Sequence, residues 1–196
     1  MNEQMKKQIE FLTEIDKSKG ILRMNWMLDE SRREDDAQHA WHACITAMVL
    51  EEYAARPVNI GHVIQMLLVH DLVEIDAGDT YAYDEEANKS KEERELKAAD
   101  RIYNLLPPDQ AKMARELWDE FEAMETPESK FANTLDKIQP AILNDAAGGV
   151  SWTSHTVYID QILKRDARVH EGSEVLWEYT KNILDENVKN GNIKTR

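Results

Sequence analysis

Residues Leu67 to Asp79 read L-L-V-H-D-L-V-E-I-D-A-G-D, an apolar run that passes into a cluster of acidic residues. His70 and Asp71 are adjacent in this stretch and can both face one cation, and Glu74 lies one helical turn beyond them. A His-Asp pair by itself is more typical of a buried helix end followed by a solvated acidic loop. Residues elsewhere in the chain therefore decide how this stretch is interpreted.

Composition limits the classes of protein to which the chain can belong. Its 196 residues suffice for one domain with a substantial core. With 38 acidic against 24 basic residues, the formal net charge of −14 disfavours nucleic-acid polymers and anionic membranes as partners. The single cysteine, Cys44, excludes an internal disulfide, and no apolar run reaches the roughly 18 residues that span a bilayer. Met1 to Ile9 is polar and amphipathic, unlike a signal peptide, so a cytoplasmic protein is expected.

Helix-favouring residues dominate the chain, which has only seven glycines and five prolines. This composition predicts an all-α fold in a single domain, residues 1–188, followed by a frayed tail at 189–196. The segment from Ile21 to Asp35 has no clean period and is expected to be a loop, and Pro140 is expected to kink or restart its helix. The predicted helices are Gln4–Asp16, Ala37–Arg56, Ile60 to about Ile75, Ser90–Leu106, Gln110–Met124, Pro127 to about Ala147, Thr156–Ala167 and Ser173–Val188.

Two of these helices carry informative apolar patterns. The helix from Ile60 is apolar on several faces, which indicates a central, buried position. The helix from Ala37 follows the N-cap signals Asp35 and Asp36 and has one apolar stripe, which is expected to face the core. The residues of this stripe are Ala40, Ile45, Met48, Val49 and Tyr53.

Candidate metal ligands lie on three predicted helices. His39 is near the start of one, His70 and Asp71 are near the end of the central helix, and Asp136 lies mid-helix among apolar residues, where a buried carboxylate needs a partner. Two imidazoles and two carboxylates suit a divalent ion with open positions for water, and this donor set admits Mn, Co, Fe, Mg or Zn. His42 shares roughly the same helix face as His39, so spacing alone does not decide between them.

Three motifs, in order, match a known family. E-D-D-A-Q-H ends at His39, H-D-L-V-E-I-D-A-G-D runs from His70 to Asp79, and F-A-N-T-L-D-K ends at Lys137. This pattern resembles the HD-domain metal-dependent phosphohydrolases, in particular the branch of bacterial 5′-deoxynucleotidases and their eukaryotic HD-domain-containing relatives. That branch reads S-[DE]-H, then H-D-x-x-E-x-x-x-G-D, then a late x-x-D-K. The second motif is the specific part of the resemblance.

The resemblance implies a single-domain HD-type helical bundle with a central metal site, and it assigns roles to individual residues. Glu74 matches the position that handles the attacking water, and Asp79 matches an active-site Asp after the Gly of a turn. One carboxylate can act as general base while a second protonates the leaving oxygen, and the sequence leaves that division open. The implied metal ligands are His39, His70, Asp71 and Asp136.

The substrate site is expected upstream of the first ligand, where the family reads R-x-G-W. This chain has Arg23-Met24-Asn25-Trp26, so Asn replaces the Gly. The resemblance makes Arg23 the phosphate-binding candidate and Trp26 a packing or sugar contact, with Arg32 and Arg33 as alternatives to Arg23. Lys137 is expected to pair with a nearby acid. The chain also lacks the family's Ser before His39 and its Tyr-Glu pair after the last ligand, which leaves substrate identity open.

The expected function is that of a metal-dependent phosphohydrolase that removes the 5′-phosphate from a nucleoside monophosphate, with a deoxynucleotide as the expected substrate. The resemblance also implies a homodimer. The same site could serve another phosphoester, such as a nucleoside triphosphate or a sugar phosphate. An alternative of another class is a helical regulatory module that binds metal or nucleotide and has lost turnover. Release of phosphate from nucleotides in the presence of a divalent metal distinguishes the enzyme from the binding module.

Overall fold

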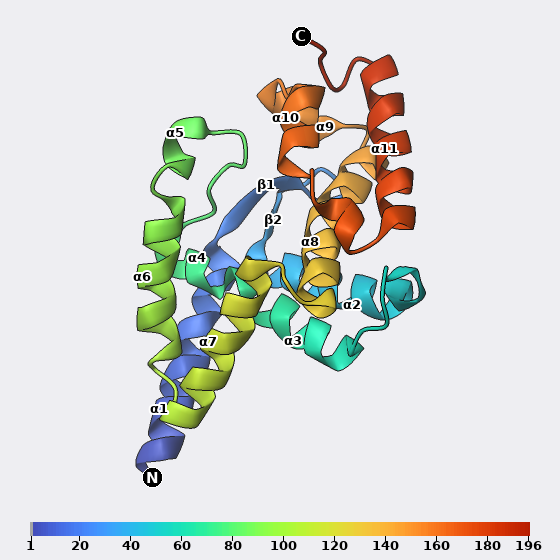
Figure 1. The fold of residues 1–196 in the computed structure, drawn as a ribbon. Coiled ribbons are helices and arrows are strands. Elements are labelled where there is room, and N and C mark those ends of the chain that lie inside the picture. Colours follow the sequence, from blue (N-terminus) through green and yellow to red (C-terminus); the bar gives the residue numbers. More distant parts are fainter. Residues whose placement is uncertain (1) are drawn as a thin grey trace.

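The structure is a computed structural model that describes residues 2–196, and helices make up most of it (Figure 1). The all-α fold class is therefore confirmed, with one correction at the segment expected to be a loop. There β1 (Leu22–Trp26) pairs antiparallel with β2 (Arg33–Asp35), and Leu22 lies opposite Asp35. The sequence hides this hairpin because most of its side chains are only half buried, so apolar residues do not alternate with polar ones.

The first half of the chain contains the central helix α3 and the hairpin, which contacts α2, α8 and α9. Asp35 caps α2 through a reciprocal capping box with Gln38, and Asn59 caps α3. The helix predicted to reach Arg56 ends earlier, at Leu50, and continues as a short 3₁₀ turn. The helical elements are α1 (Glu3–Glu14), η1 (Ile15–Gly20), α2 (Asp36–Leu50), η2 (Glu51–Tyr53), α3 (Ile60–Val69), η3 (His70–Val73) and α4 (Glu74–Ala77).

The second half surrounds the long helix α8. This helix continues through Pro140 without interruption, and the segment around Trp152, which lies outside the predicted helices, forms the short helix α9. The elements are α5 (Glu85–Asn88), α6 (Lys91–Tyr103), α7 (Pro108–Ala123), α8 (Pro127–Ala146), α9 (Val150–His155), α10 (Ile159–Arg165), η4 (Val169–Glu171) and α11 (Glu174–Lys189). Within residues 2–196, no helix combines the length and apolar character needed to cross a membrane.

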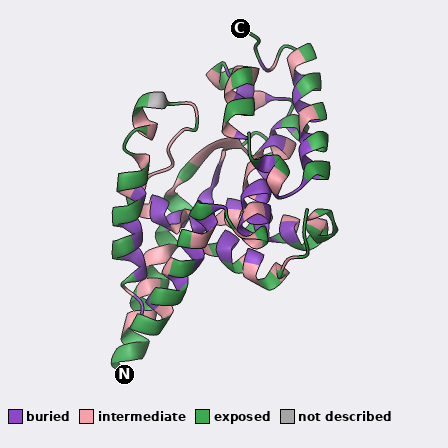
Figure 2. Ribbon diagram, in the orientation of Figure 1, coloured by how far each residue is buried: buried purple, intermediate pink, exposed green. Residues whose placement is uncertain are grey.

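The main core lies between α2, α3, α7, α8 and α11 (Figure 2). The expectation that the helix from Ile60 is central is confirmed, because Val63, Met66 and Leu67 are fully buried in it. From α8, Phe131 and Leu135 pack into the same cluster. Burial of such side chains stabilises the fold by about 1.5–3 kcal/mol each. This packing holds α8, which carries Asp136, against α3, whose C-terminal end leads directly into His70 and Asp71.

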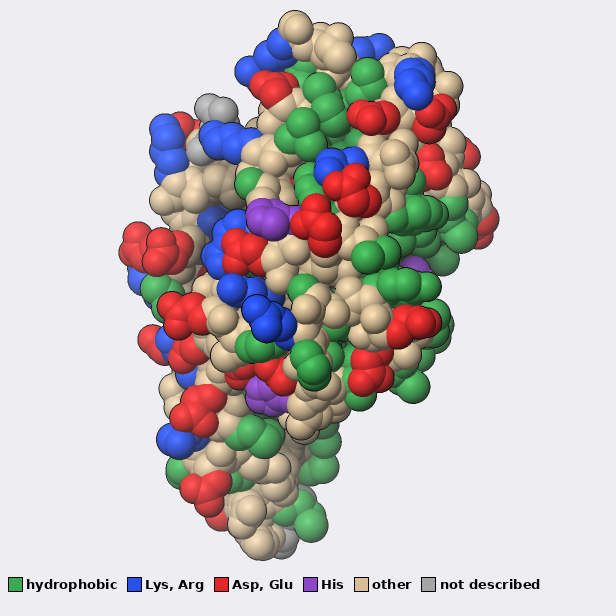
Figure 3. Space-filling model, turned by 45° about the vertical axis from the view of Figure 1, so that its right-hand side comes forward, with side chains coloured by type: hydrophobic (Ala, Val, Ile, Leu, Met, Phe, Trp, Pro, Cys, Tyr) green, Lys and Arg blue, Asp and Glu red, His purple; other side chains and the backbone are tan. Residues whose placement is uncertain are grey.

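The predicted core stripe of α2 is wrong. Met48 is 61% exposed and Val49 is 66% exposed, while the residues that face the core are Ala43, Cys44 and Ala47. Small side chains allow α2 to pack close to α3 and α8, so the larger apolar residues are left on the opposite face. Figure 3, which brings this side of the molecule forward, shows hydrophobic side chains gathered beside acidic ones.

The C-terminal tail is also more ordered than predicted. The segment 189–196 was expected to fray, but Ile193 is 1% exposed and packs into a cluster with Trp152 and Leu184. The backbone amide of Lys194 donates to the carbonyl of Val157, and its carbonyl accepts from the amide of Ile159. An apolar residue and two backbone hydrogen bonds hold this segment against α10.

Burial makes Cys44 a slow nucleophile. Burial raises the pKa of its thiol to about 11, so at pH 8 only about one thiol in a thousand is ionised, against about a quarter for a free cysteine. We expect iodoacetamide to label the native protein at least 100-fold more slowly than the urea-unfolded protein, and the native rate to rise with pH up to about 11. Mass spectrometry of quenched samples measures both rates, and equal rates would contradict the packing of α2.

Candidate metal centre

The stretch from His70 to Asp79 forms a tightened turn between two helices. The α-helix α3 ends at Val69, and the chain narrows into the 3₁₀ turn η3 before the single turn of α4. Such a 3₁₀ interruption is frequent where side chains must be aimed at one point. Gly78 then has φ of +74°, a conformation that favours glycine, and the chain reverses there. Asp79, the next residue, lines the same cavity as His70, Asp71 and Glu74.

Four candidate donor groups converge at the inner end of this turn. Nε2 of His39 lies 3.0 Å from Oδ1 of Asp136 and 3.8 Å from Oδ2 of Asp71. Nε2 of His70 lies 3.1 Å from Oδ2 of Asp71 and 3.6 Å from Oδ1 of Asp136. One cation with bonds of about 2.0–2.2 Å can reach the mutually close donors of His39, His70 and Asp136, and Asp71 lies beside this group, next to both imidazoles.

The chemistry of these donors fits a divalent ion. Nδ1 of His70 lies 2.9 Å from the carbonyl oxygen of Leu67. A carbonyl only accepts hydrogen bonds, so Nδ1 carries the proton of the neutral ring and Nε2 has a free lone pair. This Nε2 is buried and, although Oδ2 of Asp71 lies 3.1 Å away, it has no hydrogen-bond partner among the described residues, which is costly unless a cation binds it. The ligand atoms of His39, His70 and Asp136 all lie within 4.8 Å of one another. The cluster therefore can hold a metal ion.

Arg23, on β1, adds positive charge beside these carboxylates. Its guanidinium nitrogen Nη1 lies 2.5 Å from Oδ2 of Asp71 and 3.6 Å from Oδ1 of Asp36. Burial disfavours the charge of Arg23, but Asp71 and Asp136 outweigh it and raise the pKa of the guanidinium. For Asp71, burial is outweighed by His70 and Arg23, which lower its pKa. Arg23 thus stays charged at the edge of the group of candidate metal ligands.

A second group of carboxyls behaves in the opposite way. Burial, followed by the charge of Asp71, raises the pKa of Glu74 well above its ordinary value. The same two causes raise the pKa of Asp36 to about 8, and burial raises the pKa of Asp79. The site therefore holds two ionised carboxylates at the donors and a group of carboxyls that tend to keep their protons.

The group of candidate metal ligands lies at the end of a cavity of about 440 Å³. One wall is aromatic: the rings of Tyr81 and Tyr83 are 5.3 Å apart, and those of Tyr81 and His155 are 5.1 Å apart. Arg94 fixes the loop that carries the tyrosines, because its guanidinium donates to the carbonyl of Ala77 and to Oγ1 of Thr80. Cationic groups at the cavity are Arg23, Lys91, Lys137 and Arg165.

Comparison with known proteins identifies the fold family. A model of the HD domain matches residues 15–177, which cover most of the chain. The chain belongs to the HD-domain family. The sequence resemblance is thereby confirmed, and the metal cluster lies where the H-D pair of this HD domain meets the helices α2 and α8.

Known HD-domain proteins and related enzymes resemble this one to different extents. A crystal structure from Magnetospirillum magnetotacticum MS-1, named as a predicted metal-dependent phosphohydrolase, is 46% identical, with a TM-score of 0.91 over 97% of this chain and 95% of that one. Human 5′-deoxynucleotidase HDDC2 is 30% identical over 67% of this chain and 63% of that protein. The mouse protein of the same name is 30% identical over 67% and 65%, respectively. The chain thus spans slightly less than two thirds of the length of these curated relatives.

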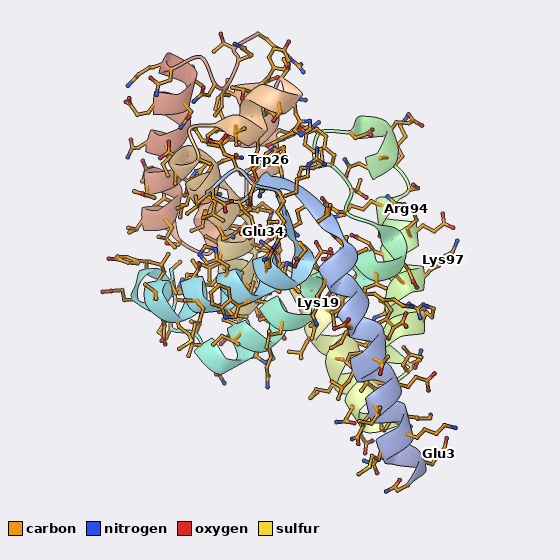
Figure 4. All side chains as sticks on the ribbon, turned by 180° about the vertical axis from the view of Figure 1, so that it is seen from behind. Glu3, Lys19, Trp26, Glu34, Arg94 and Lys97 are labelled. Atoms are coloured by element: carbon orange, nitrogen blue, oxygen red, sulfur yellow. The ribbon has the colours of Figure 1, made fainter. Side chains whose placement is uncertain are left out.

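The candidate substrate residues of this HD domain lie in different places. Arg23 lines the cavity, whereas Trp26 and Arg32 do not. Figure 4 shows Trp26 on the hairpin near the C-terminal helices, and its amide donates to Oγ of Ser151. Arg32 is at the surface and donates to the carbonyl of Arg33. The expectation for Lys137 is wrong, because no acidic group of the described side chains lies within 4.0 Å of its amine.

The structure gives three further residues a place in the site that the sequence analysis did not predict for them. Asp36, interpreted only as a capping signal, is 2% exposed beside Arg23, and neither of its carboxylate oxygens has a hydrogen-bond partner in the part of the chain that the structure describes. Gln139 and His42, which lie behind His39, were not considered as a pair. The run E-D-D before the helix was the available signal for Asp36, since only one of the two aspartates can cap it.

Proposed function

We propose that the protein is a metal-dependent phosphohydrolase that removes the 5′-phosphate from nucleoside monophosphates, with deoxynucleotides as the preferred substrates. The observation that carries this proposal is the convergence of two imidazoles and two carboxylates at the end of a cavity, beside the buried Glu74. The relatives named 5′-deoxynucleotidase support the substrate class. The aromatic wall at Tyr81 and His155 offers a surface on which a nucleobase can stack.

In this proposal the residues of the cavity divide the work. His39, His70, Asp71 and Asp136 hold a divalent ion, which when bound acidifies water and neutralises charge on a phosphoryl oxygen. Arg23, whose guanidinium lies beside Asp71 at the edge of this cluster, binds the phosphate.

Two carboxyls then carry the protons of the proposed reaction. Glu74 takes a proton from the water that attacks phosphorus, the bond between phosphorus and the sugar oxygen breaks, and Asp79 gives a proton to that oxygen. Its raised pKa suits Asp79 to this donor role.

A nucleotide panel tests the proposal. Purified protein with Mn²⁺ or Co²⁺ is expected to release inorganic phosphate from 5′-deoxynucleoside monophosphates faster than from ribonucleotides, nucleoside triphosphates or sugar phosphates. A different order of rates would favour another phosphoester as substrate. If no metal supports release from any of them, the chain is a metal- or nucleotide-binding module instead.

Arg23 is expected to act mainly in substrate binding. We expect Arg23→Ala to raise KM for a nucleoside monophosphate by about 10-fold or more with a smaller change in kcat, because the charged contact to phosphate exists before and during the reaction. Arg32→Ala is the matched control and should leave both constants unchanged, since Arg32 lies outside the cavity. Steady-state kinetics measure both, and an unchanged KM for Arg23→Ala would remove it from the phosphate site.

We further propose that the protein pairs with a second copy through the exposed face of α2. Trp41, Ile45, Met48 and Val49 recur at helical spacing, and each is more than 40% exposed. Light scattering is expected to give twice the chain mass of 22.7 kDa, and Met48→Glu together with Val49→Glu is expected to reduce it to one chain. A monomeric wild-type protein would contradict this assembly.

A further inference from the structure

The second ring nitrogen of His39 has a buried partner to which the proposed reaction gives no role. Nδ1 of His39 lies 3.0 Å from Oε1 of Gln139, which follows Asp136 by one turn of α8. His39 is 0% exposed and Gln139 is 1% exposed, so solvent cannot take the place of either group. A buried amide of this kind needs specific partners for both its oxygen and its nitrogen.

The proton on His39 determines whether its Nε2 can bind a cation. An imidazole that ligates through Nε2 carries its proton on Nδ1, and that proton needs an acceptor. The amide oxygen of Gln139 is the acceptor at hydrogen-bond distance. If the amide were reversed, its NH₂ group would face Nδ1, and the proton of a neutral ring would lie on Nε2 and exclude the cation.

Glu34 and His42 determine which way the amide points. Nε2 of Gln139 lies 3.4 Å from Oε1 of Glu34 and 2.7 Å from Nδ1 of His42. An ionised carboxylate only accepts hydrogen bonds, so the end of the amide beside Glu34 is the NH₂ group. The oxygen of the same amide must then face His39. Figure 4 shows Glu34 beside the start of α2, the helix that carries both histidines.

We propose that Gln139, oriented by Glu34 and His42, is a positioning residue that holds His39 in the tautomer able to bind the metal ion. The inference rests on the proposed metal site, because His39 is one of its ligands. It gives His42 a role as well: its Nδ1 accepts one amide hydrogen, so a residue three positions after a ligand on the same helix supports that ligand from behind.

Gln139→Met tests the inference, because methionine keeps the length of the side chain and removes both hydrogen-bonding groups. We expect Zn²⁺ affinity, measured by competition with a chromogenic chelator, to fall about 10- to 100-fold. Glu34 cannot replace the amide without moving, since its Oε2 lies 3.9 Å from Nδ1 of His39. His42→Phe should cause a smaller loss, because Glu34 still accepts from the amide.

The matched control is Asn187→Leu. Asn187, in α11, also has a buried side-chain amide and is 2% exposed. This amide donates to Oδ1 of Asp145 and to the carbonyl of Ile183. This variant should lower the melting temperature but leave Zn²⁺ affinity within about twofold of the wild-type value, as expected for loss of a buried hydrogen bond remote from the metal. A loss of affinity equal to that of Gln139→Met would mean that general destabilisation, not the tautomer, is responsible.

A measurement on the wild-type protein keeps the inference testable if Gln139→Met does not fold. Histidine-selective ¹⁵N NMR of the Zn²⁺-loaded protein is expected to show the Nδ1 proton of His39 in slow exchange with water. Rapid exchange of this proton, or equal Zn²⁺ affinity of the wild type and a folded Gln139→Met, would overturn the inference while the metal site stands. A wild-type protein that binds no divalent ion would instead overturn the proposed function.

Discussion

Glu74→Gln is expected to reduce kcat by about 10²- to 10⁴-fold while the metal stays bound, because the substitution removes a general base and no ligand. Glu74 is 5% exposed at the cavity, next to the donor cluster, and its buried Oε2 has no hydrogen-bond partner within residues 2–196 as the structure describes them. Glutamine has nearly the same shape, so the cavity should be preserved. Phosphate release and metal content, measured on the same preparation, give the two quantities.

The ionisation of Glu74 is expected to determine how kcat/KM varies with pH. Burial and then the charge of Asp71 raise the pKa of the Glu74 carboxyl, and a bound dication lowers it again. A general base works only when ionised, so kcat/KM should fall as the pH drops below the pKa of Glu74 and rise as the pH increases through it. Glu74→Gln should lose this acidic limb.

The control for Glu74 is Glu93→Gln. Glu93 pairs with Lys97 on the outer face of α6, and the substitution should change neither rate nor metal content. Full activity of Glu74→Gln, or an acidic limb that survives in it, would assign the base to another carboxyl, with Asp79 the next candidate.

Asp71→Ala is expected to remove both the metal and the activity. Oδ2 of Asp71 lies within 3.1 and 3.8 Å of the two candidate imidazole ligands, so its loss removes one of four donors and one negative charge. Since loss of an outer-shell partner alone costs about 10- to 100-fold in metal affinity, loss of a donor should cost more than about 100-fold. Elemental analysis after gel filtration, together with titration of Mn²⁺, measures the effect.

Asp76→Ala is the matched control for Asp71, because both belong to the same acidic stretch. Asp76 pairs with Arg101 instead of facing the cavity, so its variant should keep metal and activity. Asp71→Ala also leaves Arg23 without its nearest partner. Circular dichroism must therefore show that the variant is folded. Wild-type metal affinity in a folded Asp71→Ala would show that the ion binds elsewhere.

Features of the fold that depend on local contacts were predicted correctly from the sequence. Burial of α3 followed from an apolar pattern on several faces, and the cap of α2 followed from the Asp35-Asp36 pair before the helix. The packing face of α2 was predicted wrongly because the contact selects small residues, Ala43 and Ala47, and leaves larger apolar ones outside. That selection depends on how closely neighbouring helices approach, which no pattern within α2 contains.

The hairpin and the tail illustrate the same limit. Pairing of β1 with β2 is determined by backbone hydrogen bonds, and the half-buried side chains of the hairpin give no period that would reveal it. The segment 189–196 contains a single buried apolar residue, Ile193, whose partners come from distant parts of the chain. Both features depend on contacts across the fold rather than on local propensity.

The stretch from Leu67 to Asp79 determined by itself that His70, Asp71 and Glu74 lie near one another, because helical spacing is a short-range property. The tertiary structure decided the rest of the centre. His39 and Asp136 are 97 residues apart in the chain, and they meet only because α2 and α8 pack around α3. Packing alone also brings Gln139 behind His39 and Arg23 beside Asp71. Which residues face one another across a helical core is a property of the whole arrangement of helices, and no single segment contains it.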